Sequence, residues 1–141
     1  MVRQGETEAA YEKQAATLRL EAKDDALLLD AVEDFLRKRE QDVPTALLVD
    51  GIVGIDVQPE AEITRRVNNE SFWTSFAMKF PRSTGYGKLS RVGLSRNGKL
   101  AVIAHSMLAG PLMGFGKYSV FEKAGGKWIA SSRKIKGGWI S

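Results

Sequence analysis

The sequence predicts an α+β domain in which N-terminal helices pack on a four-stranded antiparallel β-meander. Before about residue 45, apolar side chains recur every three or four positions, which is the period of an amphipathic helix. After Gly85 the period falls to two, and Asn97-Gly98 separates two alternating segments with the dipeptide that best fits a tight hairpin turn. With 141 residues, 43% of them hydrophobic, the chain is long enough to bury one core, so we expect a single domain over residues 1–141.

Two helices are expected in the first part of the chain. Residues 6–23 consist mainly of strong helix formers. Residues 26–40 follow a helical apolar period, and Asp24 or Asp25 is placed to cap their N-terminus. The alternative is one long helix that is interrupted at this cap. The apolar positions expected at helical spacing are Tyr11, Ala15, Leu18, Ala22, Leu28, Ala31, Val32, Phe35 and Leu36.

The middle part, residues 46–84, is expected to hold short elements. Residues 46–57 are β-branched and apolar and predict a short strand. Pro59, at a first-turn position, opens a short helix that runs through Val67. Ser71 is placed to cap a third helical piece, whose four large aromatic residues are expected to anchor the core. These are Phe72, Trp73, Phe76 and Phe80.

Four strands are expected in the last part, residues 85–141, where apolar and polar residues alternate. A second glycine-containing turn, Ala124-Gly-Gly126, joins the third strand to the fourth. The helices then cover one side of this antiparallel sheet. The predicted strands are Lys88–Ser95, Leu100–Met107, Lys117–Lys123 and Lys127–Ile135.

A glycine-rich loop, residues 108–116, is expected between the second and third strands. Its glycine spacing does not match a phosphate-binding loop, and a strand rather than a helix follows it. One interpretation, which we favour because most large apolar side chains are internal, is a lid folded over the core. The other is an apolar surface that binds a partner. The residues on which both interpretations depend are Leu108, Leu112, Met113 and Phe115.

The charges divide sharply along the chain. Residues 1–70 contain 16 acidic and 9 basic side chains, a net charge of −7, whereas residues 71–141 contain 1 and 12, a net charge of +11. We therefore expect an acidic helical part over residues 1–45 and a basic sheet. Such asymmetry indicates a charged partner, or two halves that neutralise each other within one molecule or between two copies.

Basic side chains along the predicted sheet form the candidate site for an anion or a partner. They are interleaved with aromatic residues, as in one mode of single-stranded nucleic-acid binding, but no RNA-recognition or helix-turn-helix pattern accompanies them. The favoured interpretation is that they keep the sheet edges soluble and face the acidic helices. An acidic protein partner is a third interpretation. The candidate residues are Arg91, Arg96, Lys99, Lys117 and Arg133.

The sequence predicts no catalytic, metal or cofactor site. It has no cysteine, which excludes disulfides, zinc–thiolate sites, iron–sulfur clusters and cysteine nucleophiles. His105 is the only histidine, and its neighbour Ser106 points to the other face of a strand, so the two cannot form a nucleophile–base pair. We expect a structural role for His105. The weakest alternative is a hydrolytic enzyme that combines His105 with helical carboxylates such as Asp30 and Asp34.

The C-terminal half resembles an uncharacterised bacterial family whose members often look secreted or lipoprotein-like. The matching segments are the aromatic helix and turn Phe72–Gly85, the strand Ser90-Arg-Val-Gly-Leu94, the glycine-rich loop, and the final Trp139-Ile-Ser141. Where that family has Ser-Arg-Val-Gly-Phe-Asn, this chain has Leu94-Ser95 at the last two positions. The resemblance implies a small α+β fold in a bacterium, with a buried Arg91 that fixes the hairpin and a Trp139 that seals the core. It implies no activity.

These observations predict a non-enzymatic bacterial binding module whose partner is a protein, and an inhibitor or immunity role fits a chain of this size. Nucleic-acid or anionic-surface binding through the basic sheet is the alternative. Homo-oligomerisation through the opposite charged halves is a further expectation. No secretory or transmembrane segment is predicted, so the chain as written is expected in the cytoplasm. If a signal segment precedes it, the cell envelope or periplasm is expected instead.

Overall fold

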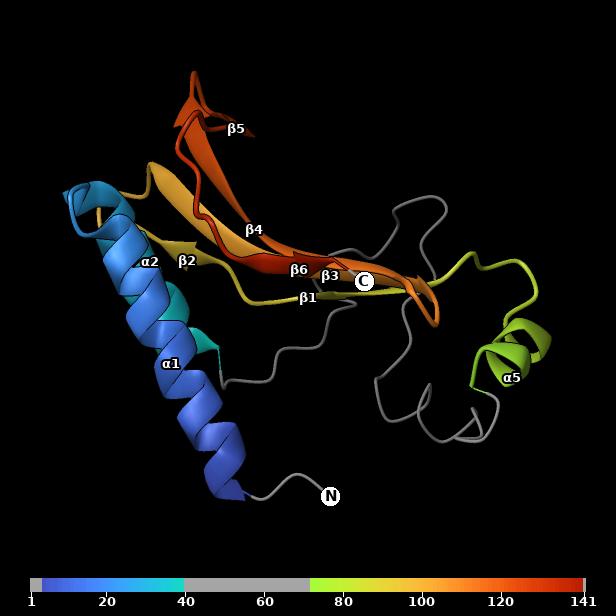
Figure 1. Ribbon diagram of the computed structural model, residues 1–141. Coiled ribbons are helices and arrows are strands. Elements are labelled where there is room, and N and C mark those ends of the chain that lie inside the picture. Colours follow the sequence, from blue (N-terminus) through green and yellow to red (C-terminus); the bar gives the residue numbers. More distant parts are fainter. Residues whose placement is uncertain (1–3, 40–71, 141) are drawn as a thin grey trace.

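The computed structural model of the protein describes residues 4–39 and 72–140, and it confirms the α+β class (Figure 1). Two N-terminal helices lie against one end of an antiparallel sheet, and a short helix lies near its other end. The strand predicted within residues 46–57 and the helix predicted from Pro59 to Val67 lie outside the described residues. In the described part, the order along the chain is therefore helices first and sheet second, as predicted.

The N-terminal helices are separate, and the predicted cap divides them. Helix α1 spans Gln4–Ala22 and helix α2 spans Ala26–Lys38. Asp25 precedes α2 with an extended backbone, and its Oδ1 accepts a hydrogen bond from the Leu28 amide at 3.1 Å. This bond satisfies an amide that has no partner inside the helix, which fixes the start of α2.

The sheet occupies four positions side by side, as the predicted meander requires. Two long central strands, β3 (Leu100–Gly110) and β4 (Met113–Ala124), form a hairpin. Each outer position is filled by two short strands, which pair with the same central strand at different points along its length. The outer strands are β1 (Tyr86–Leu89) and β2 (Gly93–Leu94) beside β3, and β5 (Lys127–Ala130) and β6 (Gly138–Ile140) beside β4.

The first predicted strand is interrupted by a bulge at residues 90–92. Leu89 pairs with His105 and Gly93 pairs with Val102, so three residues of this edge oppose two of β3. The Ser90 hydroxyl accepts a hydrogen bond from the Ala104 amide at 2.8 Å, which holds the bulge against β3. An alternating pattern does not reveal such an extra residue, and this is why the sequence predicted one unbroken strand.

The prediction of a glycine-rich loop over residues 108–116 was wrong. Strands β3 and β4 continue through most of it, and only Pro111 and Leu112 remain between them. Gly114 and Gly116 lie inside β4, opposite Leu108 and Ser106. Glycine occurs inside strands where another backbone approaches closely. The glycines of residues 108–116 therefore predicted a loop where the chain in fact forms two strands.

The fourth predicted strand is also shorter than expected. Strand β5 ends at Ala130, and Ile135 lies buried in the core. Strand β6, which the sequence analysis did not predict, then returns to pair with β4. A Cβ atom at Gly138 would lie 2.2 Å from the Gly116 carbonyl oxygen, so β6 needs a glycine there to approach β4.

The core lies between the two helices and one face of the sheet. Residues at alternate positions of the central strands contribute to it, among them Leu100, Val102 and Val120. The apolar stripe predicted for α2 is buried throughout, whereas Tyr11 of α1 remains exposed. The buried helical residues are Ala15, Leu18, Ala22, Leu28, Ala31, Val32, Phe35 and Leu36.

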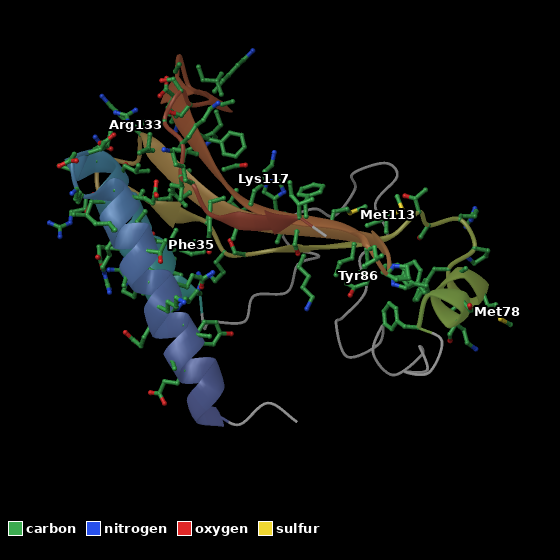
Figure 2. The ribbon with its side chains drawn as sticks, in the orientation of Figure 1. Phe35, Met78, Tyr86, Met113, Lys117 and Arg133 are labelled. Carbon is green, nitrogen blue, oxygen red and sulfur yellow. The ribbon has the colours of Figure 1, made fainter. Side chains whose placement is uncertain are left out.

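The predicted aromatic helix forms a cluster of its own instead of joining this core. Helix α5 spans Phe72–Lys79, and three of its rings lie about the Tyr86 ring with centroids 5.9–6.0 Å from it. Only Phe76 among them is buried. Figure 2 shows Tyr86 at the end of the sheet nearest α5, far from Phe35 and the helical core. Phe72, Trp73 and Phe76 thus anchor α5 to β1, and Phe80 packs on Phe76. All four lie outside the main core.

Candidate functional site

The face of the sheet turned away from the helices carries a row of exposed apolar side chains. Because Val102 and Val120 face the helices, residues at odd-numbered positions on both central strands face the other way. Met107 pairs with Phe115, and Phe115 pairs with Ile140 of β6, so the three side chains form one row across three strands. Their exposed fractions rise from 36% to 40% to 90% along it. We call these three residues the apolar row.

A shallow groove surrounds the apolar row and extends to the end of the hairpin. Its volume is about 1040 Å³, and its walls come from the ends of β3 and β4 and from β6. Leu112 and Met113 at the turn add large side chains that are 81% and 64% exposed. We call this feature the hairpin groove. It is lined by Met107, Ala109, Leu112, Met113, Gly114, Phe115, Gly116, Lys117, Gly137, Gly138 and Ile140.

The structure corrects the prediction that the apolar loop residues form a lid on the core. Leu112, Met113 and Phe115 line the hairpin groove and are exposed. Leu108 is separated from them, because it pairs with Tyr86 and points to the helix-bearing face, where it is half-buried. A long hairpin leaves no chain at its end that could fold back over the core, so Leu112, Met113 and Phe115 lie on the surface.

Sequence reasoning missed two members of the apolar row. Met107 could have been found, because the alternation of β3 continues past it and places it on the same face as His105. Ile140 could not, since its place in the row depends on β6 and on the register with which β6 pairs with Phe115. A three-residue strand has no periodicity of its own to detect.

Among the described residues that line the hairpin groove, Lys117 alone carries a charge. It lies on the same face as Phe115, and its Nζ atom is 6.0 Å from the centroid of the Phe115 ring. Figure 2 shows Lys117 rising from the sheet on the side away from Phe35. No carboxylate in residues 4–39 or 72–140 forms an ion pair with it. The groove is therefore apolar with one positive charge at its edge.

His105 is half-buried on the face of the sheet that carries the apolar row. It pairs with Lys117 across the hairpin, its Nε2 atom lies 3.0 Å from the Ser119 hydroxyl, and its ring meets the Phe115 ring edge-on. Burial lowers the pKa of His105 below its ordinary value, and the charge of Lys117 lowers it further. The helical carboxylates lie beyond the opposite face of the sheet, so the geometry gives no support to an acid–base site built from them and His105.

Replacing Lys117 by glutamine is expected to raise the pKa of His105, because the nearby positive charge that disfavours the imidazolium is removed. The measurement is an NMR titration of the His105 ring protons in the wild type and the Lys117→Gln variant. Lys123→Gln is the matched control, since Lys123 also lies on β4 but contacts Trp128 instead. An unchanged His105 pKa in Lys117→Gln would show that the two side chains do not interact as described.

The structure does not bring the five predicted anion-binding residues together. Arg133 binds Asp25 at 2.7 Å and Glu122 at 3.2 Å, and Arg96 binds Asp30 at 3.1 Å. Arg91 is half-buried within the bulge, and Lys99 is exposed near the Asn97-Gly98 turn. Lys117 alone lies in the hairpin groove. Arg133 and Arg96 thus join the sheet to the acidic helices, as the favoured interpretation predicted.

Comparison with protein-family models, curated proteins and solved structures finds no match to this chain.

Within the described residues, no group of three or more histidine, aspartate or glutamate side chains is placed to hold a metal ion. None of the helices in that part of the chain combines the length and the apolar character needed to cross a membrane. The side chain of Trp139, to which the family resemblance gives a sealing role, lies outside the description.

Proposed function

We propose that this protein is a non-enzymatic protein-binding module and that the hairpin groove is its binding site. The observation that carries the proposal is the apolar row, in which Met107, Phe115 and Ile140 lie side by side on a paired sheet and remain exposed. A contiguous apolar patch of this kind costs free energy in water and is typical of interaction sites. Its aromatic and methionine side chains are types that are enriched in the centres of protein interfaces.

The charge distribution favours a protein partner over nucleic acid. A phosphate-binding surface needs several basic side chains that point together into solvent. In this protein Arg133 and Arg96 are held by carboxylates of the helical layer and its cap, and Lys117 lies apart from them in an apolar groove. The basic half is therefore partly neutralised within the molecule, which leaves the groove as the better-defined site. We also propose that this chain is related to the uncharacterised bacterial family that its C-terminal half resembles.

We expect a displayed library of random peptides to yield sequences that bind the wild-type protein and fail to bind a tip variant, Met113→Ser with Phe115→Ser. Both changes remove exposed apolar area from the groove and leave the helical core untouched. The matched control is a basic variant, Arg96→Gln with Lys99→Gln, on which the same peptides should bind equally well. Thermal unfolding of all three proteins checks that each is folded.

Two results would overturn this proposal. Peptides that bind the folded tip variant as well as the wild type would show that the groove is not the site. Peptides lost on the basic variant and kept on the tip variant would move the site to the Asn97-Gly98 end of the sheet, where Arg96 and Lys99 lie.

A further inference from the structure

Strand β6 presents an open edge beside the hairpin groove. It pairs with β4 on one side, and no strand in the described part of the chain pairs with its other side. An unpaired edge offers backbone donors and acceptors to a further strand, and extended peptides use such edges in many recognition domains. Because Gly138 and Ile140 of β6 also line the groove, a strand added there would place alternate side chains over it.

The register of the sheet determines which side chains such a strand would meet. A residue opposite Ile140 would continue the row Met107–Phe115–Ile140. The residue two positions away points to the same face and would lie opposite Gly138, in the neighbouring row that contains Lys117. This spacing of two holds for a parallel or an antiparallel partner, because side chains alternate in both.

The second row contains a gap that fits an acidic side chain. Gly138 has no side chain, and its φ of +146° and its approach to Gly116 require glycine there. Gly138 therefore places no side chain between an added strand and Lys117. With strands about 4.8 Å apart, the added strand would lie roughly 10 Å from β4, a gap that a lysine and a facing glutamate or aspartate can bridge together.

We propose that the partner segment binds as an added strand on β6 and carries a large apolar residue with an acidic residue two positions away. The apolar residue extends the apolar row at Ile140, and the carboxylate reaches over Gly138 to the Lys117 ammonium. This inference rests on the proposed function and adds to it the chemistry of the partner. Charge complementarity at Lys117 selects an acidic residue, since no carboxylate of the described residues pairs with Lys117.

The test repeats the peptide selection on a variant in which the charge at Lys117 is reversed, Lys117→Glu. On the wild type we expect enriched peptides with Asp or Glu two positions from a large apolar residue. On Lys117→Glu we expect Lys or Arg at that position, and about tenfold weaker binding of the wild-type peptides, because reversal replaces attraction by repulsion. Lys123→Glu is the matched control, since Lys123 lies on the same strand and also near an aromatic ring, Trp128. It should select the same acidic peptides as the wild type.

The outcomes separate this inference from the proposed function. Peptides that bind the wild type but not the tip variant, and that show no change of preference on Lys117→Glu, would overturn the inference and leave the groove as the binding site. Selection of no peptide that distinguishes the wild type from the tip variant would overturn both. A raised His105 pKa in the complex with an acidic peptide would support the inference independently, because a carboxylate at Lys117 offsets its charge.

Discussion

Replacing Gly93 by alanine is expected to destabilise the domain by about 3 kcal/mol, because an added methyl group has no room where β2 meets α2. A Cβ atom at Gly93 would lie 2.4 Å from the Ala31 carbonyl oxygen and 2.5 Å from the Cβ and the amide nitrogen of Phe35. These atoms belong to a buried stretch of helix, so they cannot move aside without displacing α2 from the sheet. The measurement is urea unfolding followed by circular dichroism.

Gly110→Ala provides the matched control for this prediction. A Cβ atom at Gly110 would meet its nearest neighbour, the Met113 Cβ, at 3.6 Å, which is an ordinary van der Waals contact. Its backbone has no positive φ, so alanine is expected to change the free energy of unfolding by under about 1 kcal/mol. Equal stability of Gly93→Ala and the wild type would mean that the helical layer does not pack against β2 as described.

Replacing Asp34 by alanine is expected to lower the free energy of unfolding by about 3 kcal/mol. Asp34 is a buried residue of α2 that joins the helix to the sheet, accepting a hydrogen bond from the Leu94 amide at 2.8 Å. Its carboxylate also binds Lys38 at 2.6 Å and Arg37. Alanine leaves the amide and the partly buried ammonium without this acceptor, and such losses are costly inside a protein.

The contribution of Asp34 should depend on pH. Burial alone would raise the pKa of its carboxyl, but the hydrogen bonds from Lys38 and Leu94 and the charges of Lys38 and Arg37 lower it below its ordinary value. The stabilisation is therefore complete above the unfolded-state pKa of about 3.9 and is lost as the pH falls through the lower folded-state value. Urea unfolding from pH 7 to pH 2.5 should show the wild type and Asp34→Ala becoming more alike at the acid end.

Asp30→Ala is the control that shows whether burial is the reason for the large effect expected of Asp34→Ala. Asp30 lies on the same helix and bonds to the turn between β2 and β3. It accepts a hydrogen bond from the Arg96 amide and pairs with the Arg96 side chain, but this contact is exposed and the Arg96 side chain is 95% exposed. We expect a loss of under about 1 kcal/mol, since exposed ion pairs contribute little. If Asp30→Ala cost as much as Asp34→Ala, the buried position of Asp34 would not be the reason for its effect.

The helical half of the fold could be predicted because its signals are local. The stripe that contains Val32 and Phe35 repeats at the period of a helix, and Asp25 caps α2 through an amide three residues away. The alternation of β3 and the Asn97-Gly98 turn are local too. Each of these features needs only neighbouring residues to form, so the sequence alone reveals it.

The hairpin groove could be predicted only in part, because it depends on pairings between distant residues. Leu112, Met113 and Phe115 were found as an apolar group, but their number favoured the wrong interpretation, a lid. What exposes them is the continuation of β3 and β4 as a hairpin beyond the helical layer (Figure 1). The register of β6 against β4 then adds Ile140 and leaves the gap over Gly138. No local pattern encodes that register.

The central claim is that partners bind at the hairpin groove, and an NMR map of amide shifts tests it most directly. A peptide selected on the wild type is titrated into the ¹⁵N-labelled protein, and the shifted amides are assigned. We expect them to cluster at residues 107–117 and 138–140, while helices α1 and α2 and the Arg96–Lys99 turn stay unchanged. Shifts concentrated at that turn or on the helices, with the groove unaffected, would contradict the claim.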